Sequence, residues 1–278
     1  MISRSITSGF SLEVTAKDIP VLAQAAPAIE AGSLIAIPYL PGEREIDRLA
    51  AARAVRQLGF EPMPHVSARR IASADMFEAF VGQTGRDAGV THCLVLAGDP
   101  PSPAGPFADS DSLIATGVFE RSGIRTIGIA GHPQGHPAMN EEQCWAVLEG
   151  KCRSIEDRGM APLIVTQFAF DADAILTWLE ALRARGLGCP VRVGVPGPAG
   201  VKTLMRFAAR CGVGASASML SKYGISIGKL LGTAGPESFV DRFSAGLRKD
   251  HGAVCLHFYP FGGVAGTVEW IERYAGRI

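Results

Sequence analysis

The chain has 278 residues, of which 47% are hydrophobic and 19% charged, so it contains ample apolar material for a large buried core. Its 27 basic residues balance its 27 acidic ones without any run of like charge, which argues against nucleic-acid or anionic-membrane binding. The six cysteines lack a CxxC pair, and no apolar stretch resembles a signal or reaches the roughly 20 residues of a membrane helix, so we expect a cytoplasmic protein with reduced cysteines.

Eight short apolar runs, each ending in a Gly, Pro or polar cluster, alternate with helix-like stretches. They are Ser11–Thr15, Leu34–Tyr39, Pro62–Val66, His92–Gly98, Thr126–Gly131, Leu163–Phe168, Val191–Gly197 and Ala253–Tyr259. Strands that alternate with amphipathic helices predict parallel βαβ units, and eight units in about 250 residues match a closed (β/α)8 TIM barrel. We therefore expect an α/β fold in which residues 1–278 form a single barrel domain without a regulatory domain.

Helical periodicity appears between these runs. The predicted helices are Glu43–Leu58, Ser73–Asp87, Glu141–Arg158, Asp171–Arg185, Val201–Ala209 and Thr267–Ala275. In the first of them, Ile46, Ala50, Ala54 and Leu58 share one face, and Arg48 falls largely elsewhere. The Pro- and Gly-rich stretch 98–106 predicts a long loop, and Ala215–Leu231 predicts an additional helical segment.

Glu13 lies at the end of the first run, where a barrel carries its chemistry. If Leu12 and Val14 face the helices, the Glu13 carboxyl points into the barrel. Apolar surroundings there would raise its pKa and suit it to act as a general acid. The alternative is a structural carboxylate that a neighbouring Lys or Arg satisfies.

Polar and aromatic residues also follow other runs. Gly98 permits close approach of a ligand, and Asp99 could either cap the turn that follows or accept hydrogen bonds from the amino groups of a heterocycle. Gln167 is costly to bury unless a structural network or a polar heterocycle satisfies its amide. Tyr259 and Phe261 offer aromatic surface on which a planar ligand can stack.

Two histidines, His132 and His136, follow the fifth run. Pro133 and Gly135 interrupt the spacing that a helical metal site would need, and no third ligand accompanies the pair, so we favour two imidazoles that line a cofactor pocket. His65, in the third run, points to the same rim. The chain contains no GxGxxG, GxxxxGK[ST] or GxSxG motif, so any nucleotide is not held in the Rossmann manner.

Taken in order, these strand ends resemble the methylenetetrahydrofolate reductase family over nearly the whole chain. The matching positions are Glu13, Pro64-His65, Leu96–Asp99 against Leu-Arg-Gly-Asp, Gly135–Pro137, Thr166–Asp171 against Thr-Gln-Phe-x-Phe-Asp, and His257–Tyr259. The resemblance implies a flavin-dependent oxidoreductase of one-carbon and methionine metabolism. Such an enzyme interconverts 5,10-methylenetetrahydrofolate and 5-methyltetrahydrofolate, with FAD as cofactor and NADH or NADPH as electron donor.

The family's roles carry over to the matching positions. Glu13 would be the proton donor that helps to open the five-membered ring of the substrate. Asp99 would contact the pterin and tune the flavin, Gln167 would hydrogen-bond the folate, and Tyr259 and Phe261 would form the folate-side wall. The residues implied to hold FAD are His65, Leu96, Ala97, Gly98, Asp99, His132, His136 and Lys151. We expect tetrahydrofolate derivatives as partners, without metal, nucleic acid or membrane, and leave a homo-oligomer open.

The chain also departs from the family's pattern. Ala97 stands where many relatives have Arg, His132 where Tyr is common, Pro38 where Thr is usual and Gly263 where some carry Arg. An Arg at position 97 would offer a fork of donors to FAD. The alternative function is therefore a folate-binding barrel that oxidises or handles 5-methyltetrahydrofolate with weak or no FAD binding and a different electron carrier. An aldolase or phosphosugar isomerase is a further alternative, but no predicted strand carries an inward Lys.

Overall fold

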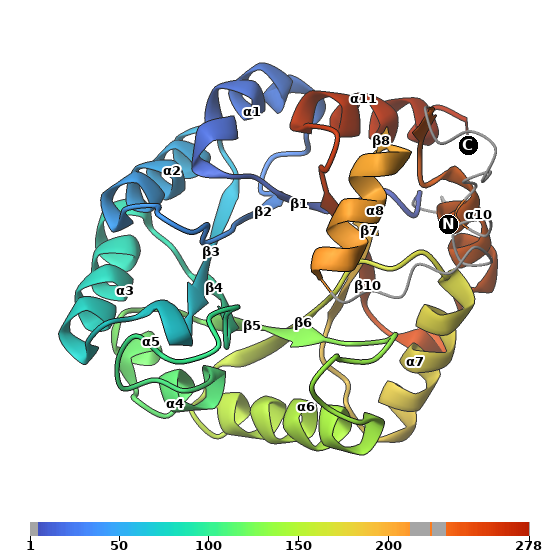
Figure 1. Ribbon diagram of the computed structural model, residues 1–278. Coiled ribbons are helices and arrows are strands. Elements are labelled where there is room, and N and C mark those ends of the chain that lie inside the picture. The colour runs from blue at the N-terminus through green and yellow to red at the C-terminus, as the bar shows by residue number, and fades with distance from the viewer. Residues whose placement is uncertain (1–4, 212–222, 224–231, 278) are drawn as a thin grey trace.

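Eight parallel strands close into a barrel in the computed structural model, which describes residues 5–211, 223 and 232–277 (Figure 1). The strands are β1 (Ser11–Glu13), β2 (Leu34–Ile37), β3 (Glu61–Ser67), β4 (His92–Leu96), β5 (Thr126–Gly131), β6 (Ala161–Thr166), β7 (Val191–Pro196) and β10 (Val254–Tyr259). Around the barrel they follow the order β1-β10-β7-β6-β5-β4-β3-β2. The prediction of a TIM barrel is confirmed, although most strands begin or end one or two residues from the predicted bounds.

Helices surround the strands (Figure 1). They are α1 (Ile19–Ala25), α2 (Glu45–Gln57), α3 (Ala74–Ala88), α4 (Ser110–Ile114), α5 (Val118–Arg121), α6 (Glu141–Glu156), α7 (Ala172–Ala184), α8 (Val201–Arg210), α10 (Glu237–Gly246) and α11 (Val264–Ala275). The predicted loop over 98–106 is present and leads into the short helices α4 and α5. Two short strands, β8 (Ala199–Gly200) and β9 (Thr233–Ala234), pair antiparallel beside α8.

The additional helical segment predicted over Ala215–Leu231 lies outside the described residues, apart from Tyr223. The Tyr223 side chain is buried, and its hydroxyl donates a hydrogen bond to the Pro196 carbonyl at 2.6 Å.

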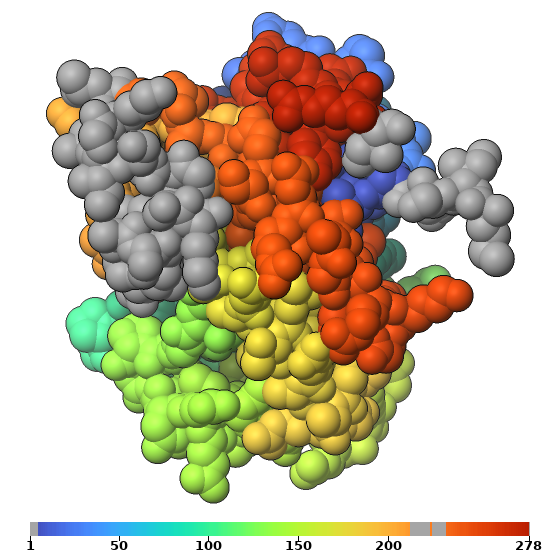
Figure 2. Space-filling view, turned by 90° about the vertical axis from the view of Figure 1, so that its right-hand side faces the viewer, coloured from blue at the N-terminus to red at the C-terminus, as the bar shows by residue number. Residues whose placement is uncertain are grey.

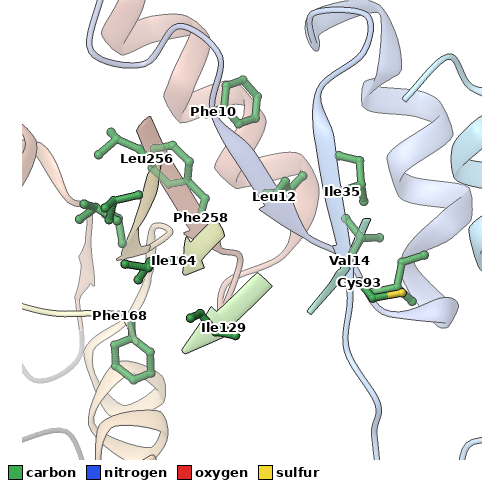
Figure 3. Close-up of a cluster of buried hydrophobic side chains, with 14 of the residues drawn as sticks. Phe10, Leu12, Val14, Ile35, Cys93, Ile129, Ile164, Phe168, Leu256 and Phe258 are labelled. Atoms are coloured by element: carbon green, nitrogen blue, oxygen red, sulfur yellow. The ribbon is translucent and has the colours of Figure 1, made fainter. Parts of the chain in front are cut away.

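Alternate residues of the strands form two separate apolar clusters. One lies between the strands and the helices and includes Leu12, Val14, Ile35, Cys93, Ile129 and Ile164 (Figure 3). The other fills the barrel interior and consists of Leu34, Ala36, Met63, Leu94, Leu163 and Val165, with Leu96 packed against it. Because successive side chains of a strand point to opposite faces, this alternation fixes which residues face the interior.

Helix α2 shows a face different from the predicted one. Ile46 is 57% exposed, whereas Leu49, Ala52 and Val55 are buried. Arg48 is buried too: its guanidinium lies over the rings of Tyr39 and Phe80 and donates to the His65 carbonyl oxygen. The apolar stem of an arginine packs like a hydrophobic side chain, so the assignment of Arg48 to the outer face was wrong.

On the side of the molecule that faces the viewer in Figure 2, α7 and α10 pack against each other. Arg242 of α10 and Asp173 of α7 form an ion pair across this contact, with nitrogen and oxygen 2.7 Å apart. Within the described part of the chain, no helix has both the length and the apolar character to cross a bilayer.

Candidate active site at the carboxyl ends of the barrel strands

Glu13 is the last residue of β1 and faces the barrel interior, because its neighbours Leu12 and Val14 are fully buried in the outer cluster. Its side chain is 21% exposed, so the carboxyl remains open to a ligand. Burial raises the pKa of Glu13 from 4.5 to about 7. Among the residues described, no Lys or Arg forms an ion pair with this carboxyl. Its charged form is therefore disfavoured, as a general acid requires.

Two buried histidines accompany Glu13. The His65 Nε2 atom lies 3.8 Å from a Glu13 carboxyl oxygen. His257 shares a hydrogen bond of 2.8 Å between its Nδ1 atom and the Ser11 hydroxyl. Burial lowers the pKa of both histidines to about 3, so both imidazoles are neutral. The Nε2 atoms of both rings are buried and find no hydrogen-bond partner within the described structure, which is unusual for buried polar atoms.

The end of β4 forms the rim beside β3. Gly98 has φ of +92°, a backbone conformation that favours glycine, and a Cβ there would lie 3.2 Å from the Ser67 Cβ. Asp99 follows with 83% of its side chain exposed, and its carboxylate lies 3.6 Å from the Arg70 guanidinium. The Ala97 carbonyl accepts a hydrogen bond from the Arg69 N–H. The Asp99 carboxylate is thus presented at the barrel mouth.

Gln167 directly follows β6 and is half-buried. Its side-chain oxygen accepts a hydrogen bond from the Phe168 N–H at 3.1 Å, and its own N–H donates to the Gly131 carbonyl at 2.9 Å. These bonds fix the start of the loop after β6, and they hold the Gln167 amide at the same end of the barrel as Glu13.

An aromatic wall forms on the side of β6 and β10. The Tyr259 hydroxyl donates to the Thr166 carbonyl at 3.1 Å, and the Tyr259 and Phe261 rings lie roughly parallel with centroids 5.8 Å apart. Phe168 meets both rings edge to face. Phe207 of α8 stacks on Phe261 with centroids 4.1 Å apart and planes at 11°. We call these four aromatic residues, Phe168, Phe207, Tyr259 and Phe261, the aromatic wall.

Helix α8 brings residues to the mouth that the sequence did not single out. In Figure 1 this helix lies inside the ring formed by the other helices, over β7 and β10. Cys211 follows it. Burial raises the pKa of the Cys211 thiol, and the carboxylates of Asp99 and Glu13 raise it further. Cys211 therefore lies within electrostatic range of both predicted catalytic carboxyls. In the sequence, Phe207 and Cys211 lie on one face of an ordinary amphipathic helix. Only the position of that helix in the fold shows that they reach the site.

A third group of predicted residues gathers near β5. The His132 and His136 rings meet edge to face with centroids 4.7 Å apart. Burial, with smaller contributions from His136 and Lys151, lowers the pKa of His132 to about 4. Lys151 is largely covered, and burial lowers its pKa while Asp111 and Asp109 oppose that change. In the described part of the chain, no three His, Cys, Asp or Glu side chains are grouped as a metal site would need.

The strand ends thus join an acid with a raised pKa, neutral imidazoles, an aromatic wall and a cationic group around one barrel mouth, the arrangement of a TIM-barrel enzyme site. The chain belongs to the methylenetetrahydrofolate reductase family, whose sequence profile matches residues 29–259.

Two curated relatives illustrate the similarity. Methylenetetrahydrofolate reductase 2 of Saccharomyces cerevisiae is 28% identical over 171 residues, 59% of this chain and 27% of the yeast protein. Methylenetetrahydrofolate reductase (NADH) 1 of Arabidopsis thaliana is 28% identical over 174 residues, 58% of this chain and 29% of the plant protein. The matched region is therefore less than a third of the length of either relative.

Solved structures share the fold. An uncharacterized protein from Clostridium thermocellum that binds two copies of 5-methyl-5,6,7,8-tetrahydrofolic acid superposes with a TM-score of 0.65 at 10% identity, covering 98% of this chain and 96% of its own. Dihydropteroate synthase from Thermus thermophilus gives a TM-score of 0.52 at 13% identity, covering 97% and 93%. At these identities the likeness shows the barrel fold alone.

Proposed function

We propose that the chain interconverts 5,10-methylenetetrahydrofolate and 5-methyltetrahydrofolate, with Glu13 as the acid. The observation that carries this proposal is the Glu13 carboxyl, held at the barrel mouth with its pKa raised to about 7. Membership of the family and the names of the curated relatives support it. A neighbour in fold that binds 5-methyltetrahydrofolate agrees with it.

The chain's own residues supply binding and proton transfer. At neutral pH about half of the Glu13 carboxyls hold a proton, which they can give to a ring nitrogen of the folate. Asp99 and Gln167 accept hydrogen bonds from the pterin amino groups, as a carboxylate and an amide oxygen can. Tyr259 and Phe261, within the aromatic wall, supply apolar surface that the planar parts of the folate contact.

The residues at the mouth also fit FAD. The buried Nε2 atom of His65 has no partner within the described residues, Gly98 allows close approach, and the partly covered Lys151 supplies a cation beside the imidazoles of His132 and His136. Together with Leu96, Ala97 and Asp99, these residues would hold the cofactor. Bound flavin would supply the two-electron redox chemistry, with NADH or NADPH as the reductant.

Flavin uptake and folate turnover test the proposal together. Purified protein incubated with FAD and then separated from unbound flavin should show the absorbance band of oxidised flavin at about 450 nm, and an anaerobic titration with NADH or NADPH should bleach it. Methylenetetrahydrofolate should then restore the band. Glu13→Gln should abolish this second step and leave flavin reduction intact, whereas Glu269→Gln on the exposed side of α11 should change neither. Full folate turnover by Glu13→Gln would overturn the assignment of the acid.

A second candidate function is folate handling with weak or no FAD binding and a different electron carrier. Asp109 and Asp111 favour it, because their charges oppose that of Lys151, the group that would meet the phosphates. This candidate predicts that the purified chain binds 5-methyltetrahydrofolate but takes up no flavin absorbance. The titration described above therefore separates the two functions.

A further inference from the structure

We infer that Arg70 is a phosphate-binding residue of this site and holds the anionic part of the dinucleotide. The inference rests on the proposed function, because it takes the dinucleotide to be FAD. Neither the matched motifs nor the strand-end pattern includes Arg70. It belongs to η3 (Ala68–Arg70), the short turn that follows β3.

The register of the sheet places Arg70 at the mouth. Strands β3 and β4 are parallel neighbours in which Ser67 lies opposite Leu96. Three residues further along each chain, Arg70 and Asp99 meet, with guanidinium and carboxylate 3.6 Å apart. Arg70 therefore occupies the rim next to Gly98, where the backbone is open to a ligand.

The loop after β4 fixes this arrangement. The Ala104 N–H donates to the Arg69 carbonyl at 2.9 Å, and the Arg69 guanidinium donates to the Ala108 and Pro100 carbonyls. These bonds tie both ends of the loop to the turn that carries Arg70. A cation held on such a frame loses little conformational entropy when it binds an anion.

The Arg70 guanidinium is held in place but keeps hydrogen-bond donors for a ligand. Its side chain is only 16% exposed and lies over the Tyr39 ring, 5.6 Å from the centroid, and Arg48 contacts the same ring. Its ion pair with Asp99 joins it to a carboxylate that is 83% exposed, and such a pair contributes little in water. A guanidinium offers five N–H donors, so most of its hydrogen-bonding capacity remains for a phosphate.

The two other arginines nearest to this rim are already engaged. Arg48 donates to the His65 carbonyl and is enclosed by two rings, and Arg69 holds the loop carbonyls. Within the described residues, Arg70 is the one of these three arginines whose side chain has no backbone partner, and it faces the mouth.

Topology decides between the dinucleotide and the folate as the source of the anion. The aromatic wall lies on β6, β10 and α8, whereas β3 and β4 lie across the barrel from β7 and β10. A folate whose pterin contacts Asp99, 3.6 Å from Arg70, and whose rings pack on the aromatic wall has its glutamate at the far end of the molecule, away from β3. The anion that reaches Arg70 is therefore the pyrophosphate of the second ligand, on the side of the mouth that also includes Lys151.

Binding of FAD and of riboflavin, which has no phosphate, tests the inference by flavin fluorescence. Arg70→Gln should raise the dissociation constant for FAD by about tenfold or more, since a charged hydrogen bond is lost, and leave that for riboflavin unchanged. Arg70→Lys keeps the charge without the fork of donors, so its dissociation constant for FAD should lie between those of the wild type and Arg70→Gln. Arg248→Gln, which removes an arginine paired with Glu180 and Asp250 ahead of β10, is the matched control and should change neither constant. Thermal unfolding of each variant checks that the fold is retained.

Three outcomes would overturn the inference. If Arg70→Gln binds FAD like the wild type, or if it weakens the binding of FAD and riboflavin equally, then Arg70 has no role in phosphate binding, although the protein still binds flavin. If Arg70→Gln instead weakens the binding of 5-methyltetrahydrofolate, the guanidinium binds the folate carboxylates and not the phosphates. If the wild type binds neither FAD nor riboflavin, both the flavin part of the proposed function and this inference are wrong. That result is distinct from the other two.

Discussion

The burial of Glu13 has a measurable cost in stability, which Glu13→Gln should relieve. The folded protein holds the Glu13 proton up to a pH of about 7, whereas an unfolded chain releases it near 4.5. Between these values the native state binds more protons than the unfolded state, so the free energy of unfolding falls as the pH rises. One pKa unit corresponds to about 1.36 kcal/mol, so this contribution falls by about 2.5 kcal/mol between pH 5 and pH 8.

Urea unfolding at both pH values measures this cost. Relative to the wild type, Glu13→Gln should gain about 2.5 kcal/mol more at pH 8 than at pH 5, because its amide does not titrate. The exposed Glu269→Gln should show the same difference from the wild type at both pH values. If Glu13→Gln also shows a constant difference, the carboxyl titrates normally in the folded protein and the argument for a retained proton is refuted.

Two further substitutions test the fold around the site. Gly98→Ala should lower the free energy of unfolding by about 1 kcal/mol or more, because φ of +92° strains an L-residue and its Cβ would press on Ser67, whereas Gly188→Ala should have little effect in the same urea titration. Arg48→Met should cost about 2 kcal/mol or more, since it leaves a buried carbonyl without its charged donor, while Arg53→Met loses only an exposed ion pair and should cost under about 1 kcal/mol. Equal losses for the two arginine variants would contradict the buried role of Arg48.

The barrel could be predicted because its strands are buried on both faces. Runs such as 126–131 and 191–197 contain little but Val, Ile, Ala, Gly and Pro, which fits parallel strands that face helices on one side and the interior on the other. Their ends were less predictable. At 97–98 and 167–168, Ala97, Gly98 and Phe168 continue the largely apolar composition past the last strand residue, so composition alone extends the strand too far.

The site could be predicted where a side chain directly ends a strand, and it could not where the residue comes from elsewhere. Glu13 follows from its place between two outward apolar neighbours. Phe207 and Cys211 reach the mouth only because α8 lies across it, and no local pattern reports that placement. Arg48 was predicted to lie away from the buried face because helical periodicity treats every charged residue as polar. It takes no account of the apolar stem of arginine, which packs inside.

The pair Arg69-Arg70 did carry a signal. Two adjacent cations directly after a predicted strand lie at the end where a barrel binds its ligands. Which of the two can bind a ligand depends on the loop after β4, whose carbonyls accept hydrogen bonds from Arg69 and leave Arg70 facing the mouth. That distinction needs tertiary structure, because the loop partners lie about 30 or more residues further along the chain.

The pH dependence of the folate step tests the role of Glu13 most directly. Pre-reduced enzyme mixed with methylenetetrahydrofolate in single turnovers should lose rate as the pH rises through about 7, where the carboxyl gives up its proton, and Glu13→Gln should show only a low rate without this transition. A rate that stays level across that range in the wild type, or the same transition in Glu13→Gln, would contradict the assignment of Glu13 as the proton donor.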